Sequence, residues 1–184
     1  MGEQKVIPDY RRLEKNLCDS IHEIQVKLGF AKESIGLYYM KPSIQQLLGV
    51  GEVEQEEFLQ LLKGFVEETS SRLGKIKITG SEGRYCFQIP VEGVCFIHQS
   101  YKENIFLKTL VEVVQAPGCT IEKVLKVFSL LSPDIICETP KGAEFDYVVY
   151  AADPTIDEYR YCFSISEMGA YYHRFTKEDY ETVL

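Results

Sequence analysis

Apolar residues recur every three or four positions in several stretches of the chain, which is the spacing of one face of an α-helix. In the first of these stretches the apolar stripe is Leu13, Leu17, Ile21, Ile24 and Leu28. Prolines stand at the start of two stretches and glycines follow two of their ends, positions that suit helix termini. The pattern predicts helices over 8–28, 42–48, 52–73, 102–115, 120–131 and 177–183.

Apolar and polar residues alternate in two other regions, which is the period of a β-strand. Residues 75–79 and 84–89 flank the segment Gly-Ser-Glu-Gly and are predicted to form a hairpin. Further strands are predicted in the last third of the chain, over 145–152, 158–166 and 170–176. β-Branched and aromatic residues favour strands, and seven of the 12 tyrosines lie after residue 144.

Three segments are less regular. Residues 33–39 are expected to be extended, and residues 134–138 are a candidate strand. For residues 91–100 the pattern fits neither a strand nor a helix well, so both interpretations stay open.

This order of elements, helices first and a strand meander last, indicates the α+β class. The N-terminal and central helices are expected to cover an antiparallel sheet built from the C-terminal three-stranded meander, with the 75–89 hairpin as a candidate extension. A length of 184 residues suits one domain over 1–184, with 1–74 as a candidate helical subdomain.

Composition narrows the setting of the chain. Apolar residues make up 45%, enough for a sizeable core, and no run approaches the 18 apolar residues that a membrane helix needs. The first ten residues lack the apolar core of a signal peptide. Four of the six cysteines lie in apolar runs, where a reduced thiol acts as a small hydrophobe. A cytoplasmic protein with reduced cysteines is therefore expected.

The net charge of −8 is unevenly distributed. Residues 51–74 carry −4 and residues 144–184 carry −6, while the rest of the chain is close to neutral. Both acidic segments would repel phosphate backbones and anionic lipids. Nucleic-acid and membrane partners are therefore disfavoured, and a basic protein is the better-matched partner.

Motifs that would indicate catalysis are absent from the sequence. The three histidines, His22, His98 and His173, lie outside metal-ligand spacing, and no phosphate-binding glycine pattern or Gly-x-Ser-x-Gly elbow occurs. Cys95 and His98 would share a face on a helix, as a nucleophile and base require, and would diverge on a strand. A buried inert thiol is the simpler interpretation. No cofactor, metal site or catalytic residue is predicted.

The faces of the C-terminal meander follow from its register, because strand side chains alternate. The expected register pairs residue 152 with 158 and residue 166 with 170. One face, expected to cover the helices, carries Phe145, Tyr147, Val149, Tyr159, Tyr161, Phe163, Ile165, Tyr171, His173 and Phe175. The other carries Asp146, Val148, Tyr150, Arg160, Cys162, Ser164, Tyr172 and Arg174.

Tyrosine and arginine are enriched at protein-binding hot spots, so the meander is the candidate recognition surface. The candidate binding residues are Tyr150, Arg160, Tyr172, His173 and Arg174. A solvated sheet face with ordinary Arg–Tyr contacts is the alternative interpretation of the same residues. For His173, a hydrogen-bonded structural histidine is likewise the alternative to a functional one.

Three segments resemble a family of uncharacterised proteins from gut Firmicutes. They are Ile35-Gly-Leu-Tyr-Tyr39, Phe145-Asp-Tyr-Val-Val-Tyr150 and Tyr172-His-Arg-Phe-Thr-x-x-Asp-Tyr180. The resemblance spans most of the chain and implies a bacterial cytosolic protein, without implying any binding or catalytic residue.

Two functional hypotheses follow. The first is a non-enzymatic module that binds a protein partner, of basic character, through an acidic and tyrosine-rich surface. The second is a small-molecule-binding domain or enzyme whose pocket is lined by His173, Tyr147 and Tyr161. A closed pocket around His173 would favour the second, and a flat exposed patch would favour the first.

Overall fold

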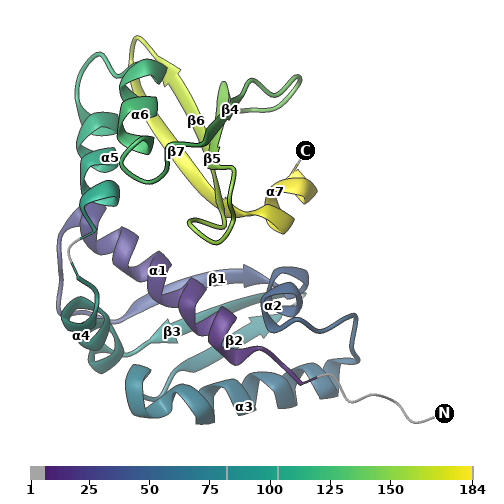
Figure 1. The fold of residues 1–184 in the computed structure, drawn as a ribbon. Helices are drawn as coiled ribbons and strands as arrows, with labels where there is room; N and C mark the ends of the chain where they lie inside the picture. The colour runs from purple at the N-terminus through teal and green to yellow at the C-terminus, as the bar shows by residue number, and fades with distance from the viewer. Residues whose placement is uncertain (1–6, 82, 103, 184) are drawn as a thin grey trace. The chain divides into compact units, whose positions relative to one another are not determined.

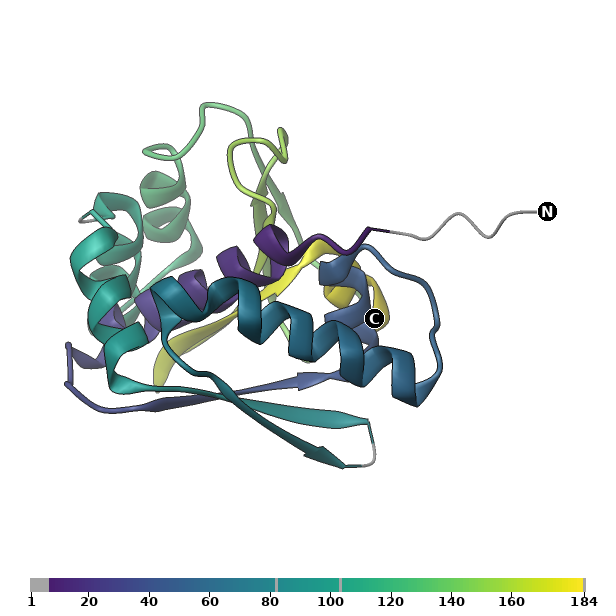
Figure 2. The same ribbon diagram turned by 90° about the horizontal axis from the view of Figure 1, so that it is seen from below.

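The computed structural model describes residues 7–81, 83–102 and 104–183 (Figures 1 and 2). The described residues fall into two compact units, the first ending at Lys102 and the second beginning after it. Each unit combines helices with its own antiparallel sheet, so the predicted α+β class is confirmed.

The first unit contains four helices and three strands among its described residues. In chain order these are α1 (Tyr10–Leu28), β1 (Ile35–Met40), α2 (Lys41–Leu48), α3 (Gln55–Leu73), β2 (Lys77–Ser81), β3 (Arg84–Ile89) and α4 (Val91–Ser100). The sheet order is β1-β3-β2, with antiparallel pairing throughout. The predicted hairpin is thus present as β2 and β3, although it belongs to a separate sheet from the C-terminal strands.

Residues 91–100, which the sequence left open, form helix α4. Pro90 is its N-cap, a position that suits proline because it has no N–H to pair, and Gly93 is fully buried. A Cβ atom on Gly93 would lie 2.4 Å from the carbonyl oxygen of Leu73. The helix therefore depends on a close approach to the end of α3, which local periodicity does not reveal.

The core of the first unit lies between its helices and one face of its sheet. Figure 2 shows α1 and α3 on the same side of the strands. The ring of Phe65 from α3 packs edge-on against Phe87 of β3, with centroids 6.1 Å apart. Leu13, Leu17 and Ile21 of α1 are fully buried, whereas Leu28 is 82% exposed. The apolar stripe of α1 is therefore shorter than its sequence spacing suggests.

The second unit begins with helices α5 (Ile105–Gln115) and α6 (Ile121–Phe128). Strands β4 (Ile135–Glu138), β5 (Tyr147–Ala151), β6 (Tyr159–Ser166) and β7 (Gly169–Thr176) follow, and helix α7 (Lys177–Val183) ends the described chain. The four strands pair antiparallel in sequential order. The predicted three-stranded sheet is thus too small, because the candidate strand at 134–138 pairs with β5 and extends it.

Two opposite faces of this second sheet are covered differently. The face toward α5 and α6 holds an aromatic core in which the Phe128 ring lies 5.0 Å from Phe106, 5.1 Å from Tyr161 and 6.1 Å from Phe163. The other face packs against α7 through a small cluster of Val148, Cys162 and Tyr180. This second face, which we call the open face, is the more accessible of the two.

The register of β7 differs by one residue from the prediction. Strands β5 and β6 pair as expected, with Val148 opposite Cys162. In the β6–β7 hairpin, however, Ser166 pairs with Gly169 and not with Ala170. The loop has two residues, and Gly169, with a φ of 143° that favours glycine, is the first residue of the strand. A shift of one residue moves every side chain of β7 to the other face.

All six cysteines are thiols in this structure. Burial raises the pKa of Cys18 to about 12 and that of Cys162 to about 11, so both stay protonated at neutral pH. Such thiols are poor nucleophiles, because the thiolate is the reactive form.

These raised pKa values predict a loss of stability at alkaline pH. The unfolded thiol of Cys162 ionises near pH 9 and the folded thiol only near pH 11, so the unfolded state is favoured as pH rises through this window. Urea unfolding at pH 8 and pH 10 should show a loss of about 1 kcal/mol from this residue. In the Cys162→Ala variant the decline between the two pH values should be smaller by that amount. An unchanged decline would contradict the prediction.

Candidate functional site

The five predicted binding residues do not form one surface. Tyr150, Arg160 and His173 lie on the open face of the second unit, whereas the register shift turns Tyr172 and Arg174 toward α5 and α6. Tyr172 is buried and its ring packs against Phe163. The guanidinium of Arg174 lies over the ring of Tyr159 at 4.2 Å. These two residues therefore contribute to the packing of the covered side of the sheet.

Tyr150 and Arg160 form a polar cluster on the open face, as the predicted register of β5 and β6 requires. The guanidinium of Arg160 stacks on the Tyr150 ring at 3.6 Å, and the Tyr150 hydroxyl donates a hydrogen bond of 2.7 Å to Glu138. Burial, together with the Glu138 carboxylate, raises the pKa of Tyr150. Within this cluster, the Tyr150 ring contacts the guanidinium of Arg160 and the Tyr150 hydroxyl contacts the carboxylate of Glu138.

His173 belongs to a different group, in which three aromatic rings surround it. Side chains two residues apart on a strand share a face, so Tyr171, His173 and Phe175 form a row along β7. Their neighbouring ring centroids are 5.7 and 6.2 Å apart, and Phe145 lies 6.0 Å from both His173 and Phe175. We call these four residues, Phe145, Tyr171, His173 and Phe175, the aromatic row.

The exposure of the aromatic row changes along its length. Phe145 and Phe175 are half-buried beside the cluster under α7, whereas His173 is exposed and Tyr171 is 55% exposed. Met168, in the turn that precedes the strand, is 97% exposed. All four residues of the row were predicted to lie on the helix-covered face. The two-residue turn before Gly169 is the signal that would have corrected this for the three residues of β7, whereas Phe145 lies before the start of β5.

Three exposed acidic residues, Glu144, Asp146 and Glu167, lie at the same end of the sheet as the exposed part of the row, where β6 turns into β7. Asp146 accepts a hydrogen bond of 2.8 Å from the backbone N–H of Ile165, and the backbone carbonyl of Glu144 accepts one from Ser164. Both contacts attach the 144–146 segment to β6. This end of the sheet is therefore acidic as well as aromatic.

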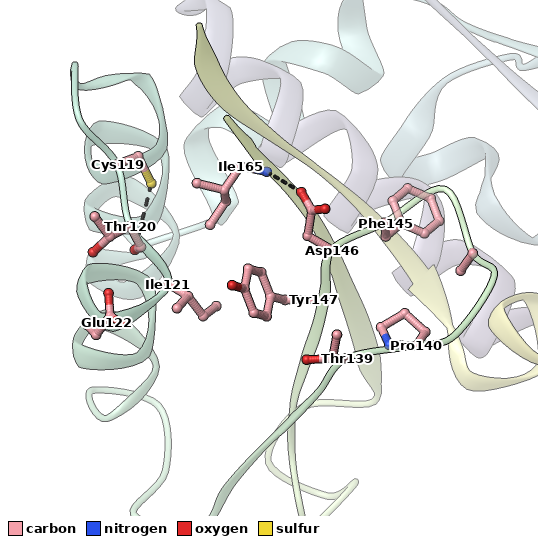
Figure 3. Close-up of a pocket in the computed structure, with 11 residues that line it drawn as sticks. Cys119, Thr120, Ile121, Glu122, Thr139, Pro140, Phe145, Asp146, Tyr147 and Ile165 are labelled. Atoms are coloured by element: carbon pink, nitrogen blue, oxygen red, sulfur yellow. Dashed lines mark hydrogen bonds between the residues drawn. The ribbon is translucent and has the colours of Figure 1, made fainter. Parts of the chain in front are cut away.

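A cleft of about 570 Å³ opens between the start of α6 and the loop before β5, and shares Phe145 with the aromatic row (Figure 3). Its polar lining includes Thr120, Glu122, Thr139 and Asp146. Hydrogen bonds from its own backbone N–H and from Thr120 lower the pKa of Glu122. The positive N-terminal end of α6 is therefore matched by the carboxylate of the helix itself. The lining residues are Cys119, Thr120, Ile121, Glu122, Thr139, Pro140, Ala143, Phe145, Asp146, Tyr147 and Ile165.

The pocket predicted from His173, Tyr147 and Tyr161 is not assembled in this cleft. Tyr147 lines it, but His173 and Tyr161 do not. Tyr161 is buried against Phe128, and the register places His173 opposite Cys162 on the other face. The three side chains therefore do not line one cavity.

Other candidate chemistry is not assembled either. Cys95 and His98 do lie on a helix, but the imidazole of His98 stacks on Phe30 at 3.9 Å, and no hydrogen bond joins it to Cys95. Within the described ranges no three His, Cys, Asp or Glu side chains are grouped to hold a metal ion.

Comparison with known proteins identifies a family whose function is unknown. Residues 10–184 match the family described as "Domain of unknown function, E. rectale Gene description (DUF3877)". The chain belongs to this family. The resemblance drawn from the three sequence segments is thereby confirmed, since the family is named for a gut Firmicute. No curated protein and no solved structure matches the chain.

The family match covers both units and all the elements described above, from α1 to α7. Among the helices of the described residues, none is long and apolar enough to cross a membrane. The family name assigns no residue, so a function has to be argued from the aromatic row and its surroundings.

Proposed function

We propose that this member of the family is a protein-binding module whose second unit binds a basic segment of a partner protein through the aromatic row. The observation that supports the proposal is the exposed end of that row, where Tyr171 and His173 lie at the same end of the sheet as three exposed acidic residues. Such a surface is matched to lysine or arginine side chains. Their cations are attracted to ring faces and to acidic groups alike.

The charge of the second unit supports a basic partner. Residues 103–184 contain 14 acidic and seven basic side chains, so a basic protein would be attracted from a distance. Two of the basic residues, Arg160 and Arg174, already lie over tyrosine rings of the same unit. Contacts between a guanidinium and a tyrosine ring thus already occur within this sheet, and we expect a cation of the partner to make the same kind of contact with the aromatic row.

The row is also rigid enough to serve as an anchor. Three of its four residues lie on β7, which is paired along all eight residues with β6, and its rings contact one another. Aromatic anchors with few rotatable bonds lose little entropy on binding, which is why they dominate many interfaces. Tyr171, whose side chain is 55% exposed, is expected to contribute most.

A defined basic peptide tests the proposal. The labelled decapeptide of five Arg-Ser repeats should bind the full chain saturably in fluorescence anisotropy, and the matching Glu-Ser peptide should not. Tyr171→Ala should weaken binding about tenfold, because a hot-spot ring is worth about 1–2 kcal/mol. Raising the salt concentration should weaken binding further.

Tyr38→Ala is the matched control for this experiment. Tyr38 is 64% exposed on β1 of the other unit and also lies beside an arginine, Arg84. Its replacement should leave peptide affinity unchanged. Equal affinities for the wild-type chain and the Tyr171→Ala variant would contradict the proposal, as would binding that is indifferent to salt.

A further inference from the structure

A second groove lies on the first unit, between helix α3 and strand β2. It has a volume of about 770 Å³, and its floor and rim are largely apolar. Leu62, Val66 and Ile78 contribute to its lining, and Leu59 on its rim is 49% exposed although apolar. Figure 2 shows α3 passing over the hairpin that β2 and β3 form.

One end of the groove is closed by a fixed contact. The amide of Gln55 donates a hydrogen bond of 2.8 Å to the hydroxyl of Tyr85, whose ring packs edge-on against Phe58. Tyr85 lies opposite Gly80 in the β2–β3 register, and a Cβ atom on Gly80 would clash with this ring. The tyrosine therefore occupies the space that a side chain at position 80 would take. Its contacts with Gln55 and Phe58 hold its ring in place at this end of the groove.

The strand that borders the groove is an edge strand. In the sheet order β1-β3-β2, strand β2 pairs with β3 on one side only. Among the described residues, no backbone hydrogen bond from another segment reaches Lys77–Ser81 on the other side. An edge of this kind offers N–H and C=O groups to a further strand.

The open end of the groove is basic. Lys75 lines it, and Lys77 lies two residues further along the edge. Within the part of the chain that the structure describes, neither lysine has an ion-pair partner. Lys63 also lines the groove, with a distant contact of 4.0 Å to Glu67. At this end of the groove three lysines thus outnumber Glu67, whereas the acidic residues that give residues 51–74 a net charge of −4 include Glu56 and Glu57 near the other end of α3.

We propose that an extended, acidic segment of another protein binds here by adding a strand to the free edge of β2. Alternate side chains of an added strand point to the same face, so the apolar residues of an alternating segment would enter the groove beside α3. The carboxylates between them would lie on the opposite face, which carries Lys77, with Lys75 at its start. This surface differs from the aromatic row in unit, shape and charge, and it selects a partner of opposite charge.

Titration of the isotope-labelled full chain with a defined peptide tests this inference by NMR. The probe is Ac-Glu-Leu-Glu-Val-Glu-Leu-NH2, which alternates acidic and apolar residues. At about 2 mM peptide, the amide signals of Ile78, Thr79 and Gly80 should shift, since weak strand addition falls in the millimolar range. The version of the peptide with N-methylated leucines should shift them little, because it cannot complete the strand ladder.

Two variants locate the binding to the groove. Leu59→Glu should weaken binding about tenfold by placing a charge on the apolar rim, whereas Leu130→Glu, an equally exposed change on the second unit, should not. Replacing both Lys75 and Lys77 by Gln should weaken it about threefold. Both leucines are solvent-exposed, so neither variant is expected to unfold.

Three results would overturn the inference. The first is an absence of shifts in β2 at this peptide concentration. The second is equal binding of the N-methylated peptide, or of the peptide with lysine in place of glutamate. The third is a change of the same β2 signals with protein concentration alone, which would assign the edge to a second copy of the chain. None of these results would bear on the aromatic row, because that row is tested with a basic peptide and a variant of the second unit.

Discussion

Replacement of Phe128 by alanine is expected to lower the free energy of unfolding by about 3–5 kcal/mol. The side chain is fully buried at the end of α6 and contacts the rings of Phe106, Tyr161 and Phe163. Removing it forfeits the burial of an aromatic ring and leaves a cavity between the helices and the second sheet. Urea unfolding followed by circular dichroism measures the loss.

Leu130→Ala is the control for this variant. Leu130 is an apolar residue of the same segment, two positions further along, but it is exposed. Its replacement should change stability by less than about 0.5 kcal/mol, since exposed positions away from special features tolerate substitution. Similar losses for the two variants would show that Phe128 does not occupy the core described here.

Replacement of Gly93 by alanine is expected to cost about 3 kcal/mol, although alanine normally stabilises a helix relative to glycine by up to about 1 kcal/mol. The added Cβ would lie 2.4 Å from the carbonyl oxygen of Leu73 and 2.8 Å from Cγ2 of Ile89. The closer of the two atoms belongs to the backbone, so relief requires α4 to move away from the end of α3. The expected sign is thus opposite to that of helix propensity.

Gly51→Ala provides the matched comparison in the same unit. No heavy atom lies within 4 Å of the position that its Cβ would take, and its φ is not positive. The variant should be as stable as the wild-type chain or slightly more stable, because alanine restricts the unfolded state. Chemical denaturation of both variants decides the matter, and a neutral or stabilising Gly93→Ala would refute the close approach of α4 to Leu73.

The candidate site illustrates where sequence reasoning was sufficient and where it was not. The pair Tyr150 and Arg160 was placed correctly, because the predicted register of β5 with β6 is the observed one and the alternation of both strands then follows. For β7 both faces carry aromatic residues, Tyr172 on one and Tyr171 on the other. Hydrophobic alternation therefore could not choose between two registers, and one residue of turn length decided which face His173 occupies.

The sequence also did not predict which strands belong to which of the two sheets. The hairpin at 77–89 was predicted, but its third strand is β1, which lies more than 40 residues earlier. β1 and β3 pair because Leu37 and Phe87 point to the same helix-covered face. Such a pairing depends on which helices cover the sheet, and the local pattern contains no information about it.

By itself the sequence determined the local elements, within a few residues at their ends: the helices α1, α3, α5 and α6, the hairpin, and the strands of the C-terminal third. These follow from periodicity, capping and turn residues, which act between neighbours a few positions apart. Only the tertiary structure decided that there are two sheets, that α4 is a helix packed on Leu73, and that Tyr171 and His173 share an open face. Those outcomes depend on packing and strand pairing between residues distant in sequence, whose energies no short window of residues contains.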